Sequence, residues 1–519
     1  MPEIRNVLFI MCDQLRADYL SCYGHPVIET PNIDRLANRG VRFTRAFVQG
    51  GVCGSSRMSF YTGRYAASHR ATWNFVPLPI DELTLGDYLT AAGRRAHLIG
   101  KTHFAPDTMA MHRCGIEDDS EASALLREGG FTLVARHEGD LPTGKADYTA
   151  FLRSKGYQGQ DPWLDYAVAV RTPDGGTADG WHMRNAHLPA RVAEEHSETA
   201  YVTDTAIDFI RRQGETPWVL HLSYIKPHWP YVAPAPYHAL YRDADTGPVL
   251  RDAREAENEH PVVSAYRRSR ASQTFADPAV ARHVRPTYMG LVRQIDTHIG
   301  RILDLLESLG RLKDTLIVFT SDHGDYLGDH GLGEKELFHD IIHRVPFLLV
   351  DPTLAADGTR GSVDDRFVEA IDVLPTILDA LALPAATHRL EGRSLLPLTR
   401  GEATAWRSSV VSELDYGLKE ARRLVGLPAA STCRAIMLRS AEWKYVYWHG
   451  FRPQLFNLAD DPDEFADLGA NPRFRQVGDR FRDEVLDWLA TRRARATLDF
   501  ATIERRTGRA PDGIHIGLW

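Results

Sequence analysis

The chain has 519 residues, 43% of them hydrophobic and 25% charged, a composition typical of a globular protein. This length suits one large α/β domain together with a smaller one. A net charge of −8 argues against a nucleic-acid-binding surface, and no apolar run is long enough to span a membrane.

The N-terminal residues run directly into a strand-like apolar segment, and no signal peptide precedes it. The five cysteines are scattered along the chain and form no CxxC pair. This usage is typical of free thiols in a reducing compartment rather than of a disulfide framework. We therefore expect a cytoplasmic protein.

Short apolar runs end directly in polar residues that could carry chemistry. Because turn residues bound them, runs of this length suit buried strands. Asp13, His228 and Asp322 lie just beyond their ends. The three runs are Val7–Met11, Trp218–Tyr224 and Leu316–Thr320.

Helical patterns lie between these strands. The clearest is Tyr288–Leu309, with apolar residues at helical spacing and Gly310 as its C-terminal stop. Alternating strands and helices indicate an α/β fold with a largely parallel sheet covered by helices on both faces. In such sheets, sites form beyond the carboxyl ends of the strands.

Two regions look less regular and are expected to be inserts. Residues 105–200 are rich in glycine and polar residues, and residues 240–285 are strongly charged. Long inserts often cover an active site or form subunit contacts. We expect a catalytic domain over residues 1–405 and a smaller C-terminal part over residues 406–519.

The segment Val52–Arg64 is the most informative stretch of the chain. Cys53 follows a glycine pair and precedes two serines, which are good N-cap residues, so a helix is expected to begin at Cys53. Free backbone N–H groups and the helix dipole favour an anionic ligand there. Arg57 lies about one turn further on. Taken alone, the cysteine could equally be a small buried apolar residue.

Asp13-Gln14 follows the first predicted strand, and Asp322-His323 follows a later one. Two carboxylates, an amide oxygen and an imidazole make a plausible site for one divalent cation. Oxygen-dominated ligation suits Ca²⁺, Mg²⁺ or Mn²⁺. The imidazole nitrogen makes Mn²⁺ a more plausible metal here than it would be for a set of oxygen ligands alone.

Lys101 and His103 lie two apart after another apolar stretch. On an extended segment they would point to the same side. A compact cation beside an imidazole suits the binding of an anionic ester and the movement of protons.

Taken in order, these segments resemble the type I, formylglycine-dependent sulfatases of the alkaline phosphatase superfamily and their phosphonate-hydrolysing relatives. The Cys53 segment resembles the Cys-x-(Pro/Ala)-x-Arg signature, with Ser55 in place of Pro or Ala. The resemblance implies a large mixed, mostly parallel sheet sandwiched by helices. It also implies a smaller C-terminal antiparallel sheet with a helix at Phe474–Arg493.

The resemblance also implies roles for individual residues. Cys53 would be oxidised by a formylglycine-generating enzyme and would act as nucleophile and metal ligand, with Ca²⁺ the most expected metal and Mn²⁺ or Mg²⁺ possible. The other implied ligands are Asp13, Gln14, Asp322 and His323. Arg57 would orient the nucleophile, and His103 would remove a proton from it. The groups that would hold the ester oxygens are Asn74, Lys101, His228 and Lys335, and His228 or Lys335 would protonate the leaving oxygen.

The resemblance leaves the substrate open between two classes. A glutamine at position 14 resembles the pattern of phosphonate monoester hydrolases and of the choline-sulfatase-like group. Lys101 and His103 instead favour sulfate monoesters as substrates. The primary expectation is a sulfatase acting on aryl or alkyl esters, and the alternative is a phosphonate monoester hydrolase or phosphodiesterase. A catalytically silent metal-binding protein would result if Ser55 prevented maturation, and a thiol-based redox protein lacks a resolving cysteine.

In some members of the family that this chain resembles, a C-terminal tail contributes to oligomer assembly. The stretch Arg505–Trp519 carries mixed charge and ends in an apolar Ile-Gly-Leu-Trp. A tail of this kind could dock on a neighbouring subunit or fray. A homo-oligomer is therefore expected.

Overall fold

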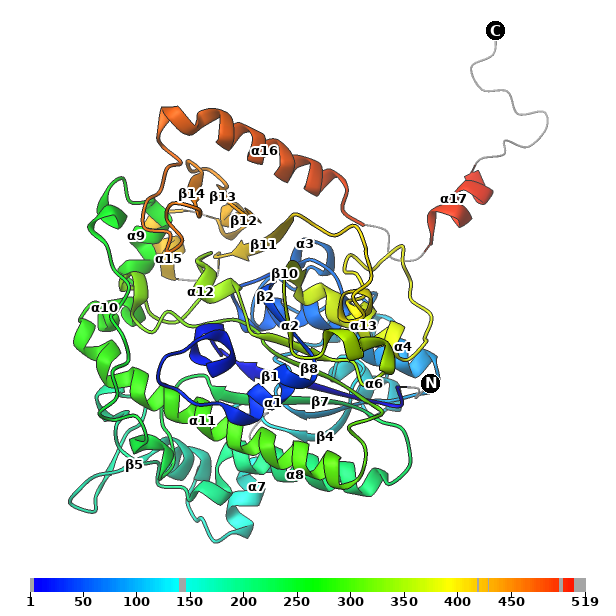
Figure 1. Ribbon diagram of the computed structural model, residues 1–519, viewed down its shortest axis with the longest axis vertical. Helices are drawn as coiled ribbons and strands as arrows, with labels where there is room; N and C mark the ends of the chain where they lie inside the picture. The colour runs from blue at the N-terminus through cyan, green and yellow to red at the C-terminus, as the bar shows by residue number, and fades with distance from the viewer. Residues whose placement is uncertain (1–3, 140–145, 418–419, 428, 494–497, 508–519) are drawn as a thin grey trace.

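The computed structural model describes residues 4–139, 146–417, 420–427, 429–493 and 498–507 (Figure 1). Most of the expected tail, from residue 508 onward, lies outside the described residues. Within the described part of the chain, no helix combines the length and apolar character that crossing a bilayer requires.

A mixed, mostly parallel sheet forms the centre of the molecule. Its strand order is β10-β2-β9-β8-β1-β7-β3-β4. Only β9 runs antiparallel to its neighbours among these strands. The bounds are β1 Asn6–Asp13, β2 Val41–Phe47, β3 Ala96–Gly100, β4 Thr132–Arg136, β7 Val219–Pro227, β8 Thr315–Ser321, β9 Phe347–Val350 and β10 Ser362–Glu369.

Helices cover both faces of this sheet, because side chains alternate along each strand. Leu8 and Ile10 of β1 pack into one core, whereas Val7 and Phe9 pack into the other. The first core includes side chains of α1 (Pro31–Arg39), α8 (Glu198–Gln213) and α11 (Pro278–Ser308). The second includes side chains of α2 (Cys53–Thr62), α4 (Leu85–Ala91) and α13 (Val373–Ala380). The predicted α/β architecture is confirmed.

A second, antiparallel sheet follows the main part of the chain, as the resemblance implied. Its strands are β11 Ser409–Asp415, β12 Arg434–Ser440, β13 Trp443–Trp448 and β14 Gln454–Asn457. Helix α16 (Arg475–Ala490) packs on this sheet through Phe481 and Val485, at the top of Figure 1.

The second sheet shares a core with the segment that carries Cys53. Val52 and Trp73 pack in one apolar cluster with Met437 and Trp448. The C-terminal part therefore buttresses the Cys53 segment directly. A domain boundary at residue 405 stays a prediction.

The predicted strands agree with β1, β7 and β8 to within a few residues, but the long helix begins earlier than predicted. α11 starts at Pro278, ten residues before the predicted Tyr288. Asp277 caps its first turn and Pro278 occupies the first helical position, where a missing N–H costs nothing. Pro286 inside the helix hid this continuity, because an internal proline usually ends a helix.

The two expected inserts contain more regular structure than predicted. Strand β4 joins the edge of the main sheet from within residues 105–200. Further elements in the inserts are α5 Thr108–Arg113, α6 Glu121–Arg127, α7 Ala146–Ser154, β5 Val170–Arg171, β6 Thr177–Ala178, α9 Pro261–Arg267 and α10 Arg270–Phe275. Short helices elsewhere are α3 Ala66–His69, α12 Asp340–His343, α14 Leu396–Thr399, α15 Glu420–Val425 and α17 Phe500–Thr507.

Candidate active site

Cys53 is the first residue of α2, as predicted, but the serines do not cap the helix. The N-cap is Val52, which makes no side-chain cap hydrogen bond. Ser56 lies inside the helix and donates to the backbone carbonyl of Asp322, 2.6 Å away. The cap comes from outside the helix, because Asn74 Oδ1 accepts the N–H of Gly54 at 2.7 Å. Asn74, predicted to contact substrate, thus lies directly beside the first turn of α2, which begins at Cys53.

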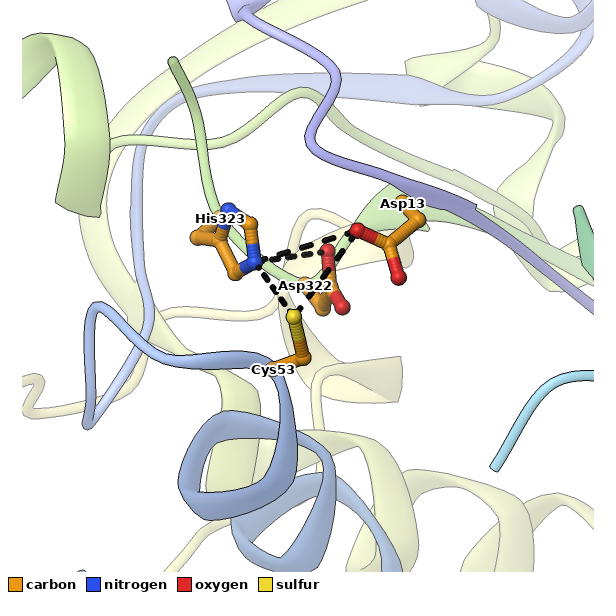
Figure 2. A group of neighbouring side chains, drawn as sticks. All are labelled: Asp13, Cys53, Asp322 and His323. Atoms are coloured by element: carbon orange, nitrogen blue, oxygen red, sulfur yellow. Dashed lines mark hydrogen bonds and ion pairs between the residues drawn. The ribbon is translucent and has the colours of Figure 1, made fainter. Parts of the chain in front are cut away.

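Four side chains converge on one point beyond the carboxyl ends of β1 and β8 (Figure 2). One ligand atom each of Asp13, Cys53, Asp322 and His323 lies within 4.8 Å of the others, and all four residues are buried. Cys53 Sγ is 3.1 Å from His323 Nε2 and 3.9 Å from Asp13 Oδ1. The structure therefore brings these four predicted ligands together.

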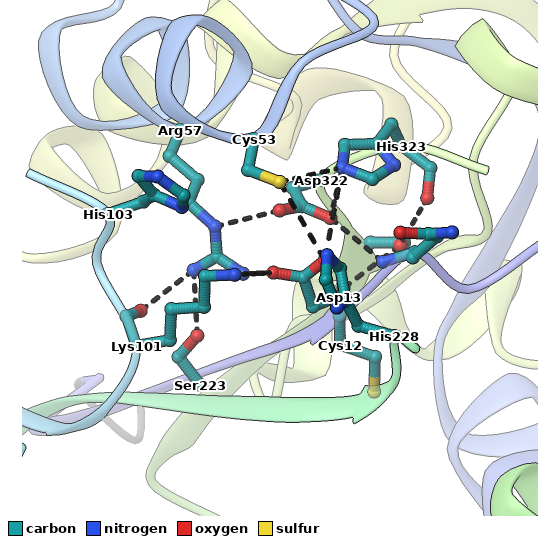
Figure 3. Close-up of polar contacts among 12 residues, drawn as sticks. Cys12, Asp13, Cys53, Arg57, Lys101, His103, Ser223, His228, Asp322 and His323 are labelled. Carbon is teal, nitrogen blue, oxygen red and sulfur yellow. Dashed lines mark hydrogen bonds and ion pairs between the residues drawn. The ribbon is translucent and has the colours of Figure 1, made fainter. Parts of the chain in front are cut away.

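Arg57 fixes the orientation of both carboxylates (Figure 3). Its Nη2 donates to Asp13 Oδ2 at 3.1 Å, and its Nε donates to Asp322 Oδ2 at 2.7 Å. One oxygen of each carboxylate is thereby occupied, and the Oδ1 atoms lie near His323 Nε2, at 3.9 and 3.7 Å. The planar guanidinium suits this task because its donors have a fixed geometry.

The histidine of this group has one ring nitrogen engaged and the other turned toward the site. His323 Nδ1 lies 2.9 Å from the carbonyl oxygen of Gly324, so a proton on Nδ1 is donated there. Nε2 then carries the lone pair that faces the carboxylates. This is the arrangement by which proteins prepare a metal-binding histidine.

Lys335, Gln14 and His228 form a second set of contacts at the same site. Lys335 Nζ donates to Gln14 Oε1 at 3.0 Å and lies 3.1 Å from His228 Nε2. His228 Nδ1 lies 2.7 Å from the carbonyl oxygen of Trp229, so Nε2 is free to accept from the ammonium. Burial and the nearby Lys335 charge lower the pKa of His228, which favours this neutral form.

Lys101 and His103 reach the site by a turn and not along an extended segment. Gly100 and His103 have φ angles of 103° and 53°, in the left-handed region. Lys101 Nζ lies 2.8 Å from Asp13 Oδ2, and His103 interacts with the Cys53 side chain, among the residues drawn in Figure 3. The expectation of an extended segment was therefore wrong, because His103 has a left-handed backbone conformation.

Cations dominate the electrostatics around Cys53. Burial by itself raises the pKa of the Cys53 thiol, but Lys335, Lys101 and His323 hold it well below its usual range. Burial and Cys53 likewise raise the pKa of the Asp13 carboxyl, and Lys101 and His228 reverse that shift and lower it. A negative charge at position 53 is therefore strongly favoured.

Several residues that hold the site in place carry no sequence signal of their own. Ser223 Oγ accepts from Arg57 Nη1 at 2.8 Å. The carboxylate of Glu138, from the first insert, accepts the backbone N–H groups of Thr102 and His103. Asp325 accepts the N–H of Leu327 in its own loop at 2.9 Å and also accepts from Gln14 Nε2 at 2.6 Å. These contacts depend on loop conformations that no short motif encodes.

The Sulfatase family model matches residues 5–383, and the model of the C-terminal region of N-sulphoglucosamine sulphohydrolase matches residues 328–491. The chain is 32% identical over 508 residues to the multifunctional alkaline phosphatase superfamily protein PehA of Trinickia caryophylli, covering 93% of this chain and 95% of PehA. It is 28% identical to an arylsulfatase of Clostridium perfringens, covering 94% of this chain and 95% of that protein.

The phosphonate monoester hydrolase of Silicibacter pomeroyi has a similar structure, with a TM-score of 0.82 and 31% identity, covering 93% of this chain and 94% of that one. This likeness agrees with the observed sheet order and with the second sheet. The chain belongs to the sulfatase family of the alkaline phosphatase superfamily.

Proposed function

We propose that this protein hydrolyses sulfate monoesters at Cys53. The observation that carries the proposal is the pair of buried lysines at the site, Lys101 with Nζ 2.8 Å from Asp13 Oδ2 and Lys335 with Nζ 3.1 Å from His228 Nε2. The same cations would attract the single negative charge of a sulfate monoester. A buried site makes these interactions stronger than they would be in water.

The donor set fits a divalent cation, as family membership implies. The Oδ1 atoms of Asp13 and Asp322 and the Nε2 lone pair of His323 converge, and Arg57 neutralises the outer oxygens. Gln14 Oε1 is the fourth proposed protein ligand. When bound, such a cation supplies Lewis-acid chemistry that makes a hydroxyl group acidic near neutral pH. Carboxylate, amide and imidazole donors accommodate Ca²⁺, Mn²⁺ or Mg²⁺, with Ca²⁺ proposed first.

Oxidation of Cys53 to formylglycine would supply the hydrated aldehyde that serves sulfatases as nucleophile. Arg57 would hold Asp13 and Asp322 in the orientation that this group needs. Lys101 would face a non-bridging ester oxygen, because its ammonium already lies against the carboxylate of Asp13. Asn74 would hold the helix N-terminus in register beside the same oxygens.

Lys335 is better placed than His228 to protonate the leaving oxygen. His228 Nδ1 faces a carbonyl, and its Nε2 accepts from the lysine, so the imidazole has no further proton to give in this state. Lys335 carries three protons and can turn one toward the ester. His228 would then orient the ammonium, and His103 would accept a proton from the nucleophile on the other side.

Phosphonate monoesters and phosphodiesters form the second candidate substrate class. They carry one negative charge, as sulfate monoesters do, so the same two lysines could hold them. Gln14 and the likeness to a phosphonate monoester hydrolase favour this class. Lys101 and His103 favour sulfate, and we rank sulfate first on that ground.

The ranking is tested by measuring kcat/KM for an aryl sulfate, an aryl phosphonate monoester and an aryl phosphodiester with the same leaving group. We expect the sulfate to be the best substrate. A higher kcat/KM for either phosphorus ester would reverse the order of the two candidates.

Replacing Cys53 with alanine should abolish hydrolysis of all three esters while the protein stays folded. Mass analysis of the tryptic fragment 46–57 of the wild-type protein should show aldehyde in place of thiol. Full activity of Cys53→Ala would refute the scheme. An unmodified thiol in a protein that binds metal but turns over no ester would instead identify the catalytically silent alternative.

Three further proposals concern partners and location. A formylglycine-generating enzyme would mature Cys53, since no ordinary side chain supplies the aldehyde. The scattered cysteines support a cytoplasmic location. The apolar end of the sequence supports a homo-oligomer, which sedimentation of the full-length chain would test.

A further inference from the structure

Gln14 has every polar group engaged although its backbone is strained. Its φ of 66° lies in the left-handed region, which is uncommon for a residue other than glycine. Its N–H donates to Asp322 Oδ1 at 3.0 Å, and its carbonyl accepts from Tyr288 at 2.7 Å. Strain of this kind persists where the surroundings over-determine it, and it clusters at functional sites.

The side-chain amide of Gln14 could point either way, since its oxygen and nitrogen are nearly the same size. Which end faces the proposed metal decides whether Gln14 is a ligand, because only the oxygen can coordinate a cation. Lys335 Nζ lies 3.0 Å from Oε1 on one side, and Asp325 Oδ2 lies 2.6 Å from Nε2 on the other.

Asp325 is fully buried and its carboxylate is surrounded by donors. Oδ1 accepts the N–H of Leu327 at 2.9 Å. Oδ2 accepts from Tyr231 at 2.6 Å as well as from Gln14. An ionised carboxylate can only accept hydrogen bonds, so the amide must turn its nitrogen toward Asp325.

We propose that Asp325 is a positioning residue that selects the amide orientation of Gln14 and so holds Oε1 toward the metal-binding group. This inference rests on the proposed function, since it assigns Asp325 a task in forming the metal site. Asp325 does not itself belong to the converging donor group. It places a negative charge directly behind the neutral side chain of Gln14.

Asp325→Asn tests the idea with little change in shape. Because the N–H of Leu327 needs an acceptor at Oδ1, the new amide nitrogen takes the place of Oδ2. It then faces two other donors, Gln14 Nε2 and the Tyr231 hydroxyl, and Gln14 is expected to flip. Affinity for Mn²⁺ and Ca²⁺, measured by calorimetry on chelator-stripped protein, should fall about 10- to 100-fold.

Two further variants separate positioning from general damage. Tyr231→Phe removes the other donor to Oδ2 but leaves the acceptor for Gln14, so metal affinity should stay at the wild-type level. In the double variant Gln14→Glu/Asp325→Asn, a carboxylate oxygen at position 14 can accept from the new amide nitrogen. Its second oxygen again faces Lys335, so metal affinity should recover.

Circular dichroism and melting temperature confirm that each variant is folded before its affinity is compared. A folded Asp325→Asn protein that binds metal as tightly as wild type would overturn the positioning role alone. A double variant as weak as Asp325→Asn would overturn it too, because the effect would then come from the loop at Leu327. Wild-type protein that binds neither cation would overturn the proposed metal-dependent function along with it.

Discussion

Arg57 aligns several groups of the site by donating hydrogen bonds to them. It is completely buried, and it donates to two carboxylates, to the Ser223 hydroxyl and to the Lys101 carbonyl. These partners come from four separate segments of the chain. The fixed fork of one guanidinium therefore aligns groups that a flexible cation could not align together.

Arg57→Lys should lower kcat/KM by at least about 100-fold, because misplaced catalytic groups cost this much even when the charge is kept. Metal affinity should fall in parallel, since Asp13 and Asp322 lose the donors that orient them. The check is to measure both quantities on the same preparation. Unchanged metal affinity alongside lost activity would show that Arg57 acts on the nucleophile alone.

The residues that meet at the site were largely predictable, whereas those that support them were not. Asp13 and Asp322 each follow an apolar run, and the ends of neighbouring parallel strands necessarily meet. Ser223, Glu138 and Asp325 act through hydrogen bonds to residues that are distant in the sequence or lie in irregular loops. Nothing in their local sequence distinguishes such residues from other polar loop residues. The catalytic roles themselves stay predictions.

The junction between β3 and β7 is the element on which Lys101 and Ser223 both depend. Gly100 ends β3 with a φ of 103° and lies against the carbonyl of Ser223. A Cβ at this position would meet that carbonyl oxygen at 1.9 Å, so the backbones could not keep their separation.

Gly100→Ala should therefore destabilise the protein by more than the roughly 1–3 kcal/mol of backbone strain, and it should also lower activity. Gly93→Ala is a matched control, because Gly93 also has positive φ but has nothing within 4 Å of its would-be Cβ. Chemical denaturation measures the free energy of unfolding of the two variants. Equal losses of unfolding free energy in the two variants would contradict the proposed clash.

Strands were predicted better than the boundaries of helices. β1, β7 and β8 are completely buried and mostly apolar, so their limits were found to within a few residues. The start of α11 was missed because Pro286 lies inside the helix, and an internal proline usually ends a helix. Strand β4 was missed because an edge strand with exposed residues lacks the apolar run of a buried one.

Across the whole molecule, buried neutral histidines couple stability to pH. Burial lowers the pKa of His69 and His221 to about 3, and that of His260 and His343 to about 4. In the unfolded chain these groups titrate near their ordinary value of 6.5. Below that pH the unfolded state binds protons that the folded state cannot accept, so stability falls as pH falls.

The melting temperature should therefore decline as the pH is lowered from 7.5 to 5.5. Each fully titrating histidine contributes up to about 1.4 kcal/mol per pH unit to the slope. His260→Asn keeps a side chain that can cap α9 but removes the titration, so its slope should be shallower. A melting temperature independent of pH over this range would contradict the expectation.

At this scale, the sequence predicted two sheets, but it did not predict how they join. The shared cluster of Val52 and Trp73 with Met437 and Trp448 unites residues almost 400 positions apart. Contacts between residues so far apart leave no local sequence pattern from which they could be predicted. They are decided by which apolar surfaces remain uncovered once each sheet has formed.

The burial of Cys53 also limits the time during which its proposed oxidation could take place. Cys53 is only 1% exposed, and every residue of α2 is buried. A modifying enzyme could not bind this segment once β8 has paired with β1 in the centre of the sheet, because the segment is then buried. At about 5–20 residues per second, synthesis reaches His323 on the order of 15 to 50 seconds after Cys53. The proposed oxidation of Cys53 would therefore have to be finished within that interval, or on a chain kept from folding.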